Sequence, residues 1–350
     1  MFAYNQNVIA IPPGETIREQ LKSRGMSQKE FAERMGISEK HISNLINGKV
    51  ELTSEMALKL ESVLGVPAAF WNNLESRYRE QLARIKKDKE IDQEIEMMKK
   101  IPYSKISGLG WLPKTSDKKE KISNLRSFFE VANLNLLNNL SIPGIAYRKT
   151  GANATSDYSL AAWAQKARLE ARGVTVSPIN INKLEKSIPY IRSLTIQSPL
   201  IFCDQLKKTL SECGIVIIFL PHIGGSFLHG ASFIDNNRII LGLTVRRKYA
   251  DVFWFSLFHE LYHIIAGHVF RENETTQQEE DQADTFAKDV LIDPNDYDDF
   301  IQLHEFSKTA IKTFAKKIGI DPGIVVGRLQ KENIIRYNQL TDLKSRYEIE

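Results

Sequence analysis

Two histidines, a glutamate and the spacing between them mark the part of this chain that could do chemistry. His259 and His263 flank Glu260 in the pattern H-E-x-x-H. On a helix, side chains four residues apart lie on one face, so both imidazole rings can reach the same metal ion. Glu260 would then lie where a general base for a water activated by zinc belongs. The pattern predicts a Zn²⁺ site that hydrolyses peptide bonds, with Glu260 as its catalytic base.

The segment that carries these histidines is typical of a helix buried in a domain core. Residues 248–267 contain no proline and no interior glycine, and they are apolar nearly all round. Histidines inside such a helix are costly unless their ring nitrogens are satisfied. Ser256 and Ala266, on the histidine face, are small and leave room for a metal and a substrate. Gly267 is expected to end the helix.

A zinc site needs a third protein ligand. The longer pattern with a third histidine is excluded, because Ala266 and Val269 stand where glycine and histidine would be required. A second helix over residues 278–291 offers a carboxylate instead. Glu280 and Asp284 share one face of it, so we expect Glu280 to bind zinc and Asp284 to orient a ligand histidine.

Other interpretations of this acidic run stay open. Glu279 is an alternative carboxylate ligand, and His268 is a weaker candidate because it lies at or beyond the end of the first helix. A run of acidic residues on a helix is also usual for a solvated face. The upstream H-E-x-x-H pattern is what favours a metal ligand here.

Three short apolar runs and a turn are typical of strands and a hairpin: residues 216–220, 230–234 and 238–243, with the turn at 235–237. A sheet edge above the zinc helix would let a substrate peptide add as an extra strand. The candidates for stabilising charge on the attacked carbonyl oxygen are Tyr262, His229 and His222.

The first 70 residues carry a second functional pattern. Ser27 can cap a helix over residues 28–35, with Glu30 at the reciprocal capping position, and Ser38 can cap a helix over residues 39–47. Two short helices joined by a glycine-containing turn describe a helix-turn-helix. Helices before and after it would complete the bundle: residues 14–23 and 53–64. Its small core is expected to contain Phe31, Ala32, Met35, Ile37, Ile42, Leu45 and Ile46.

The second helix of this pair would enter the major groove of double-stranded DNA. Asparagine and lysine suit the edges of adenine and guanine. The residues expected at the DNA are Ser38, Glu39, Lys40, His41, Ser43 and Asn44 on or at this helix, with Gln28, Asn47 and Lys49 contacting phosphates. Residues 1–80 hold ten Lys or Arg and ten Asp or Glu, so a dimer with local basic patches would be needed.

Residues 214–294 resemble the ImmA/IrrE family of metallo-endopeptidases. The matching parts are, in order, GIVIIFLP, HGASFIDNNRIILGL, FWFSLFHELYHIIAGH and EEDQADTFAKDVLIDP. The resemblance implies a zincin-like fold, zinc on both histidines and Glu280, Glu260 as base, and a protein substrate. That substrate would be a repressor, an antitoxin or the chain itself. Tyr262 departs from the family, which usually has glycine there, and could narrow the cleft.

The amino-terminal segment is similar to the HigA-type antitoxins of the Cro/C1 (XRE) helix-turn-helix class. The similarity is carried by PPGETIREQLKSRGMSQKEFAERMGISEKHISNLINGKVELTSEMALKLESVLGVPAAFWNNLE. It implies a homodimer that binds its own operator, often with a toxin as partner. Antitoxins of that type usually end soon after this segment, whereas this chain continues to residue 350.

Length and composition fit two or three domains with cores of their own. The chain has 350 residues, of which 42% are hydrophobic, and a net charge of +4. Cys203 and Cys213 form no C-x-x-C pair and no disulfide framework, so the cytoplasm is the expected compartment. No signal peptide is evident, and no stretch approaches the roughly 18 apolar residues that span a membrane.

Together these patterns predict an α+β chain with an all-α amino-terminal domain and a small sheet near the carboxyl end. The expected parts are a helix-turn-helix domain (1–72), a helical connector (73–100), a helical spacer of unknown role (101–200) and a zinc peptidase domain (201–340). The segment from Phe314, FAKKIGIDPGIVVGRLQ, repeats the helix-turn-helix pattern, but its second helix is apolar and is expected to pack inside the peptidase domain.

Two functions are compatible with the sequence. The first is a DNA-binding regulator that carries a zinc-dependent endopeptidase. The second is an autorepressor or antitoxin without proteolytic activity, whose carboxyl-terminal domain binds a ligand or a toxin.

Overall fold

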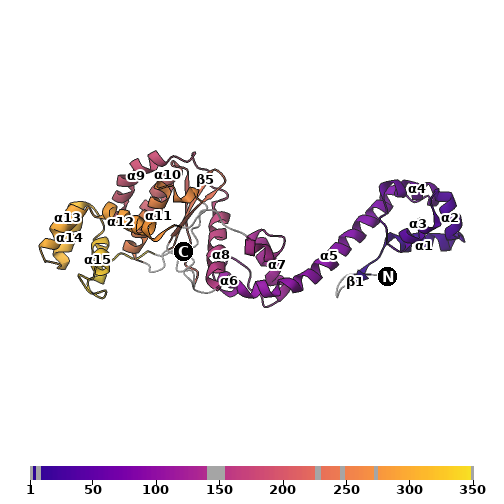
Figure 1. Ribbon diagram of the computed structural model, residues 1–350, viewed down its shortest axis with the longest axis horizontal. Coiled ribbons are helices and arrows are strands. Elements are labelled where there is room, and N and C mark those ends of the chain that lie inside the picture. Colours follow the sequence, from indigo (N-terminus) through magenta and orange to yellow (C-terminus); the bar gives the residue numbers. More distant parts are fainter. Residues whose placement is uncertain are drawn as a thin grey trace. The chain divides into compact units, whose positions relative to one another are not determined.

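A computed structural model gives the fold of the chain. It describes residues 3–4, 9–139, 154–224, 230–244, 249–271 and 275–347. The chain divides into two compact units, Met1–Glu96 and Met97–Glu350, and helix α5 (Ala68–Lys100) contains the boundary between them (Figure 1). Over the described ranges, no helix has both the length and the apolar character needed to cross a bilayer.

The amino-terminal unit is a helical bundle preceded by a short pair of antiparallel strands. Its elements are β1 (Ala3–Tyr4), β2 (Ile9–Ala10), α1 (Pro13–Arg24), α2 (Gln28–Met35), α3 (Glu39–Ile46), α4 (Ser54–Leu64) and the first part of α5. The helices expected here are confirmed, and their bounds differ by one residue at most. The two-residue strands β1 and β2 were not predicted from the sequence.

Polar residues set the starts of the helices in this unit. Ser27 accepts a hydrogen bond from the backbone N–H of Glu30, and Ser38 accepts one from that of His41. The Glu30 carboxylate, expected at the reciprocal position of a capping box, accepts a hydrogen bond from Arg34 at 2.7 Å. These caps fix where α2 and α3 begin, and hence the turn between them.

The core of the amino-terminal unit contains the residues expected there. Phe31, Ala32, Met35, Ile42, Leu45 and Ile46 are buried, and Ile37 packs against them partly buried. Helix α1 approaches α3 so closely that a Cβ on Gly14 would lie 2.0 Å from the carbonyl oxygen of Ile46, so only glycine fits there. Trp71, in the first turn of α5, completes this core and donates a hydrogen bond to the carbonyl of Val66 at 3.1 Å.

The carboxyl-terminal unit contains helices around one small sheet. Its elements are α6 (Tyr103–Gly108), α7 (Lys118–Phe129), η1 (Leu134–Asn139), α8 (Ala154–Ala171), α9 (Ile181–Ser193), η2 (Leu194–Ile196), α10 (Pro199–Ser211), β3 (Ile215–Phe219), β4 (Gly230–Asp235), β5 (Arg238–Leu243), α11 (Ala250–Ile265), η3 (His268–Phe270), α12 (Gln277–Leu291), α13 (Pro294–Gln302), α14 (Lys308–Ile318), α15 (Pro322–Lys331) and η4 (Thr341–Leu343). The α+β class is therefore confirmed.

The sheet has the order β3-β5-β4, with β5 parallel to β3 and antiparallel to β4. All three strands were expected, within one residue at each end. The turn between β4 and β5 holds Asn236 in the left-handed region (φ 55°), which asparagine tolerates better than most residues. In the described parts of the chain, β4 pairs only with β5, so its outer edge has no neighbouring strand.

The two faces of this sheet are covered by different helices. Ile239, Leu241 and Leu243 of β5 share a buried core with α11. Helix α8 covers the other face, where a Cβ on Gly242 would lie 2.4 Å from the ring of Trp163. Part of the region expected to be a spacer thus forms one layer of the same unit as the sheet.

The segment that repeats the helix-turn-helix pattern packs inside the carboxyl-terminal unit, as expected. It forms α14 and α15, and the apolar side chains of α15 are buried in the core that also contains α11: Ile324, Val325, Val326 and Leu329. Helix α15 contacts α11 directly. These side chains are therefore used for packing.

Candidate metal centre and nucleic-acid interface

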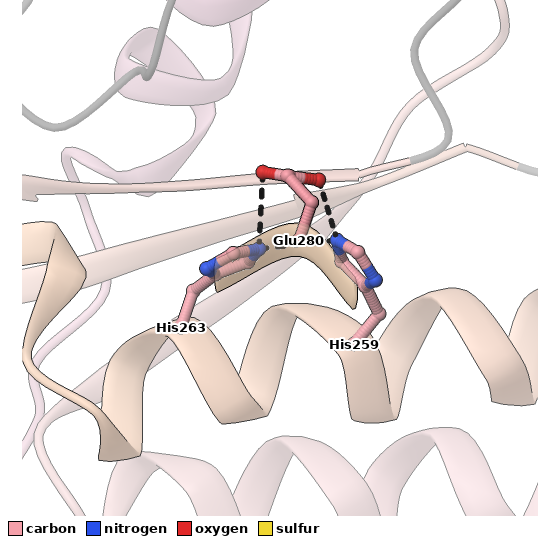
Figure 2. A group of neighbouring side chains, drawn as sticks. All are labelled: His259, His263 and Glu280. Carbon is pink, nitrogen blue, oxygen red and sulfur yellow. Dashed lines mark hydrogen bonds and ion pairs between the residues drawn. The ribbon is translucent and has the colours of Figure 1, made fainter. Parts of the chain in front are cut away.

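Helix α11 positions the two histidines of the H-E-x-x-H pattern. It is buried among apolar residues along its length and ends at Ile265, with Ala266 as its C-cap and Gly267 next in a left-handed conformation (φ 76°). His259 and His263, one turn apart, are 9% and 7% exposed. Figure 2 shows both rings on the same side of the helix. That both rings lie on one side of α11 follows from their four-residue spacing.

Helix α12 brings the expected carboxylates to these rings. It begins with a capping box, in which Thr276 and Glu279 satisfy each other's backbone N–H groups. Ala283 and Ala287 are small and fully buried on the side that faces the core, which allows α12 to pack closely on α11. Glu280 projects between the two histidines (Figure 2).

Three donor groups converge on one point. The Nε2 atoms of His259 and His263 are 3.1 Å apart, and the two carboxylate oxygens of Glu280 lie 3.4 Å and 3.5 Å from them. One ligand atom from each residue can be chosen so that all lie within 4.8 Å of one another. Ligands of a tetrahedral zinc ion at its usual bond lengths are about 3.3 Å apart, so this donor set fits Zn²⁺.

The other nitrogen of each imidazole is engaged by a different residue. His259 Nδ1 lies 2.8 Å from the Asp284 carboxylate, which is the orienting contact expected for Asp284. His263 Nδ1 lies 2.7 Å from Nδ1 of His268. Since Asp284 can only accept when ionised, His259 Nδ1 carries the proton and its Nε2 lone pair faces the centre. This is the tautomer that a metal ligand requires.

The two alternative ligands lie outside this group of donors. The Glu279 carboxylate accepts hydrogen bonds from the Thr276 backbone and from Arg271, at 2.8 Å and 2.6 Å. The Thr276 N–H is the largest influence, and with Arg271 it lowers the pKa of Glu279 to about 2. His268 is buried behind His263, and burial lowers its pKa. Glu280 was the carboxylate preferred from the spacing, and its oxygens are the ones that lie beside both histidines.

Glu260 lies against strand β4. One of its carboxylate oxygens accepts a hydrogen bond from Ser232 Oγ at 3.0 Å. A Cβ on Gly230 would lie 2.8 Å from Glu260 Cγ, so glycine makes room for this side chain. Neither Ser232 nor Gly230 was predicted from the sequence as part of the site. The alternation of β4 could have placed them on one face, but only the fold shows that α11 covers that face.

Tyr262 lies on the side of α11 that meets α12. Its hydroxyl donates a hydrogen bond to Gln282 at 3.2 Å, and its ring packs on Phe286 at 5.3 Å between centroids. It lines an open groove of about 710 Å³ that runs along α12 past Asp281 and Asp289. His229, another candidate for stabilising the carbonyl oxygen, lies outside the described residues.

Helix α3 presents the residues expected at DNA. Glu39, Lys40, Asn47 and Lys49 are exposed, as is Gln28 on α2, whereas His41, Ser43 and Asn44 are half-buried. Two of these residues, Ser38 and Asn47, also stabilise the ends of α3. The Ser38 hydroxyl caps α3, and the Asn47 side-chain amide donates to the carbonyl of Ser43 at 2.7 Å at the other end of the helix. Arg18 of α1, which was not predicted from the sequence, approaches Asn47 at 3.5 Å and pairs with Glu15 at 2.7 Å.

Comparisons with known proteins find similarity to helix-turn-helix proteins. The family HTH_3, described as Helix-turn-helix, matches residues 17–71. An uncharacterized HTH-type transcriptional regulator of Escherichia coli K12, YddM, is 41% identical over 66 residues, which are 19% of this chain and 70% of that protein. The antitoxin HigA-1 of Vibrio cholerae is 37% identical over 83 residues, covering 21% of this chain and 78% of the antitoxin.

A solved structure is also similar to this chain. It is an addiction module antidote protein of the HigA family from Coxiella burnetii, which is 31% identical. The match covers 24% of this chain and 94% of that one, with a TM-score of 0.23.

Proposed function

We propose that this chain, which belongs through its amino-terminal unit to the helix-turn-helix family, is a DNA-binding transcriptional regulator with a zinc-dependent endopeptidase domain. The DNA would be its own operator, bound as a homodimer. The peptidase substrate would be a repressor, an antitoxin or the chain itself. Two observations support the two halves: the helix-turn-helix similarity, and the convergence of three metal donors beside Glu260.

The metal half of the proposal depends on the chemistry of the donor set. Nε2 of His259, Nε2 of His263 and the Glu280 carboxylate would hold Zn²⁺, and Asp284 would orient His259. Zinc supplies a Lewis acid that polarises the scissile carbonyl and makes water more acidic. Three protein ligands leave a coordination position open, as catalytic rather than structural zinc sites do.

The protein's own residues would handle the proton and the peptide. Glu260 takes the proton of the water that attacks the carbonyl carbon, and returns it to the amine nitrogen as the C–N bond breaks. Ser232 holds the carboxylate of Glu260 in place from β4. The outer edge of β4, unpaired within the described residues, is where an extended peptide could add as a further strand.

Metal content tests the proposal most directly. Elemental analysis of the purified protein should give about one zinc per chain, and His263→Ala should retain almost none, because a zinc site of this kind needs three protein ligands and only two would remain. His304→Asn is the matched control, since His304 is exposed and has a positive φ (51°) that asparagine tolerates. A wild-type protein without zinc, even after reconstitution, would contradict the enzyme half of the proposal.

The contact between Ser232 and Glu260 predicts a smaller effect. We expect Ser232→Ala to lower peptide cleavage about tenfold with zinc content unchanged, since a hydrogen bond to a charged group contributes about 1.5 kcal/mol or more. Ser232→Thr keeps the hydroxyl and should restore most of the rate. Ser198→Ala, at an exposed helix cap on α10 without a side-chain hydrogen bond, serves as control. Equal rates for Ser232→Ala and wild type would show that this contact does not position the base.

A second candidate function is an antitoxin-like autorepressor without proteolytic activity. The observation that favours it is the similarity to the antitoxin HigA-1 of Vibrio cholerae. Its carboxyl-terminal unit would then bind a ligand or a toxin. A short toxin-like reading frame beside the gene would favour this function, and cleavage that depends on Glu260 would exclude it.

A further inference from the structure

The proposed metal centre has a matching contact behind each histidine. His259 is held through Nδ1 by Asp284 at 2.8 Å, and His263 is held through Nδ1 by His268 at 2.7 Å. We infer that His268 is a positioning residue for His263, which accepts its Nδ1 proton and so turns the Nε2 lone pair toward the site. This inference rests on the proposed function for its purpose, although its geometry is independent of a metal.

The hydrogen positions follow from one requirement. For Nε2 of His263 to donate to a metal, its proton must be on Nδ1. That proton can only be donated to an unprotonated Nδ1 of His268, whose own proton is then on Nε2. This Nε2 lies 3.5 Å from the Glu279 carboxylate, a group that favours a proton at that nitrogen. Each contact in the series His263, His268 and Glu279 therefore pairs one donor with one acceptor.

The fold holds each member of this series in place. The left-handed turn at Gly267 ends α11 and directs the chain into η3, which folds His268 back beside the helix it has just left. Glu279 is fixed by Arg271 and by the Thr276 backbone N–H. Among the described residues, the Tyr262 ring from α11, at 5.9 Å between centroids, and the Arg271 cation after η3 also face His268.

This arrangement links both metal-binding helices. Glu279 caps α12 and also faces His268, and the next residue of α12, Glu280, is the proposed third ligand. The orientation of His263 on α11 thus depends, through His268, on Glu279 of α12. Glu279 is next to Glu280, which would share the metal with His263. Partners of this kind commonly change metal affinity by about 10- to 100-fold when removed.

The experiment uses two variants of the full chain. His268→Phe keeps a planar ring but has no acceptor, and His268→Asn replaces Nδ1 with an amide oxygen at the matching distance from the backbone. We expect zinc affinity, measured by competition with a chelator, to fall about 10- to 100-fold in His268→Phe and to recover largely in His268→Asn. His304→Asn is again the control and should match wild type. Melting of the metal-free proteins shows that each variant folds.

The outcomes separate this inference from the proposed function. If zinc affinity is unchanged in His268→Phe, or if asparagine restores it no better than phenylalanine, the inference is wrong although the metal centre stands. If wild type binds no zinc, the proposed metal centre fails, and the inference fails with it.

Discussion

Cleavage of peptide bonds should fall by about 10²- to 10⁴-fold when Glu260 is replaced by Gln, while zinc content stays at the wild-type level. Glutamine has nearly the same shape and can still accept the hydrogen bond that Ser232 donates, but its amide cannot take a proton from water. The three proposed zinc donors are other residues, so metal binding should persist. A library of peptides with mass-spectrometric detection measures cleavage without knowledge of the natural substrate.

The Glu260→Gln experiment distinguishes a zinc endopeptidase from an antitoxin-like protein without proteolytic activity. Glu185→Gln makes the same chemical change at an exposed position of α9 and should cleave like wild type. Cleavage at the wild-type rate by Glu260→Gln would show that Glu260 is not the base. A wild-type protein that holds zinc but cleaves nothing, including itself, would favour the antitoxin-like function and a metal without a catalytic role.

The centre of the candidate site could be predicted because it depends on local periodicity. His259 and His263 share a face through four-residue spacing, and Glu280 and Asp284 share one on the next helix for the same reason. The contacts behind these residues depend on where the chain goes next. His268 contacts His263 after the left-handed turn at Gly267, whereas from the spacing alone it is a residue at or beyond the end of the helix.

The same distinction applies to the fold. Helices α2 and α3 were predictable from the caps Ser27 and Ser38, which act within three residues. The packing of α8 on the sheet was not predictable, because it depends on Trp163 meeting a glycine of β5 that is distant in sequence. The contact of Ser232 with Glu260 was not predictable for the same reason, since it depends on which face of β4 is turned to α11.

Binding to the DNA upstream of its own coding sequence should weaken by about 5- to 150-fold when Asn44 is replaced by Ala. Asn44 lies half-buried on α3, the helix expected in the major groove, and an asparagine that bonds a base edge contributes about 1–3 kcal/mol of discrimination. Lys40→Ala should cause a loss of similar size if Lys40 contacts guanine. If it contacts a phosphate instead, binding should weaken on all sequences and depend less steeply on salt.

Fluorescence anisotropy at several fixed salt concentrations distinguishes these two roles of Lys40. Lys59→Ala removes the same charge from α4, where Lys59 pairs with Glu55 at 3.3 Å, and it should bind DNA like wild type. The unit has equal numbers of acidic and basic residues in its first 80 positions, so affinity must come from a few well-placed contacts rather than from a general positive field. Unchanged binding by both Asn44→Ala and Lys40→Ala would therefore place the DNA on another face of the bundle.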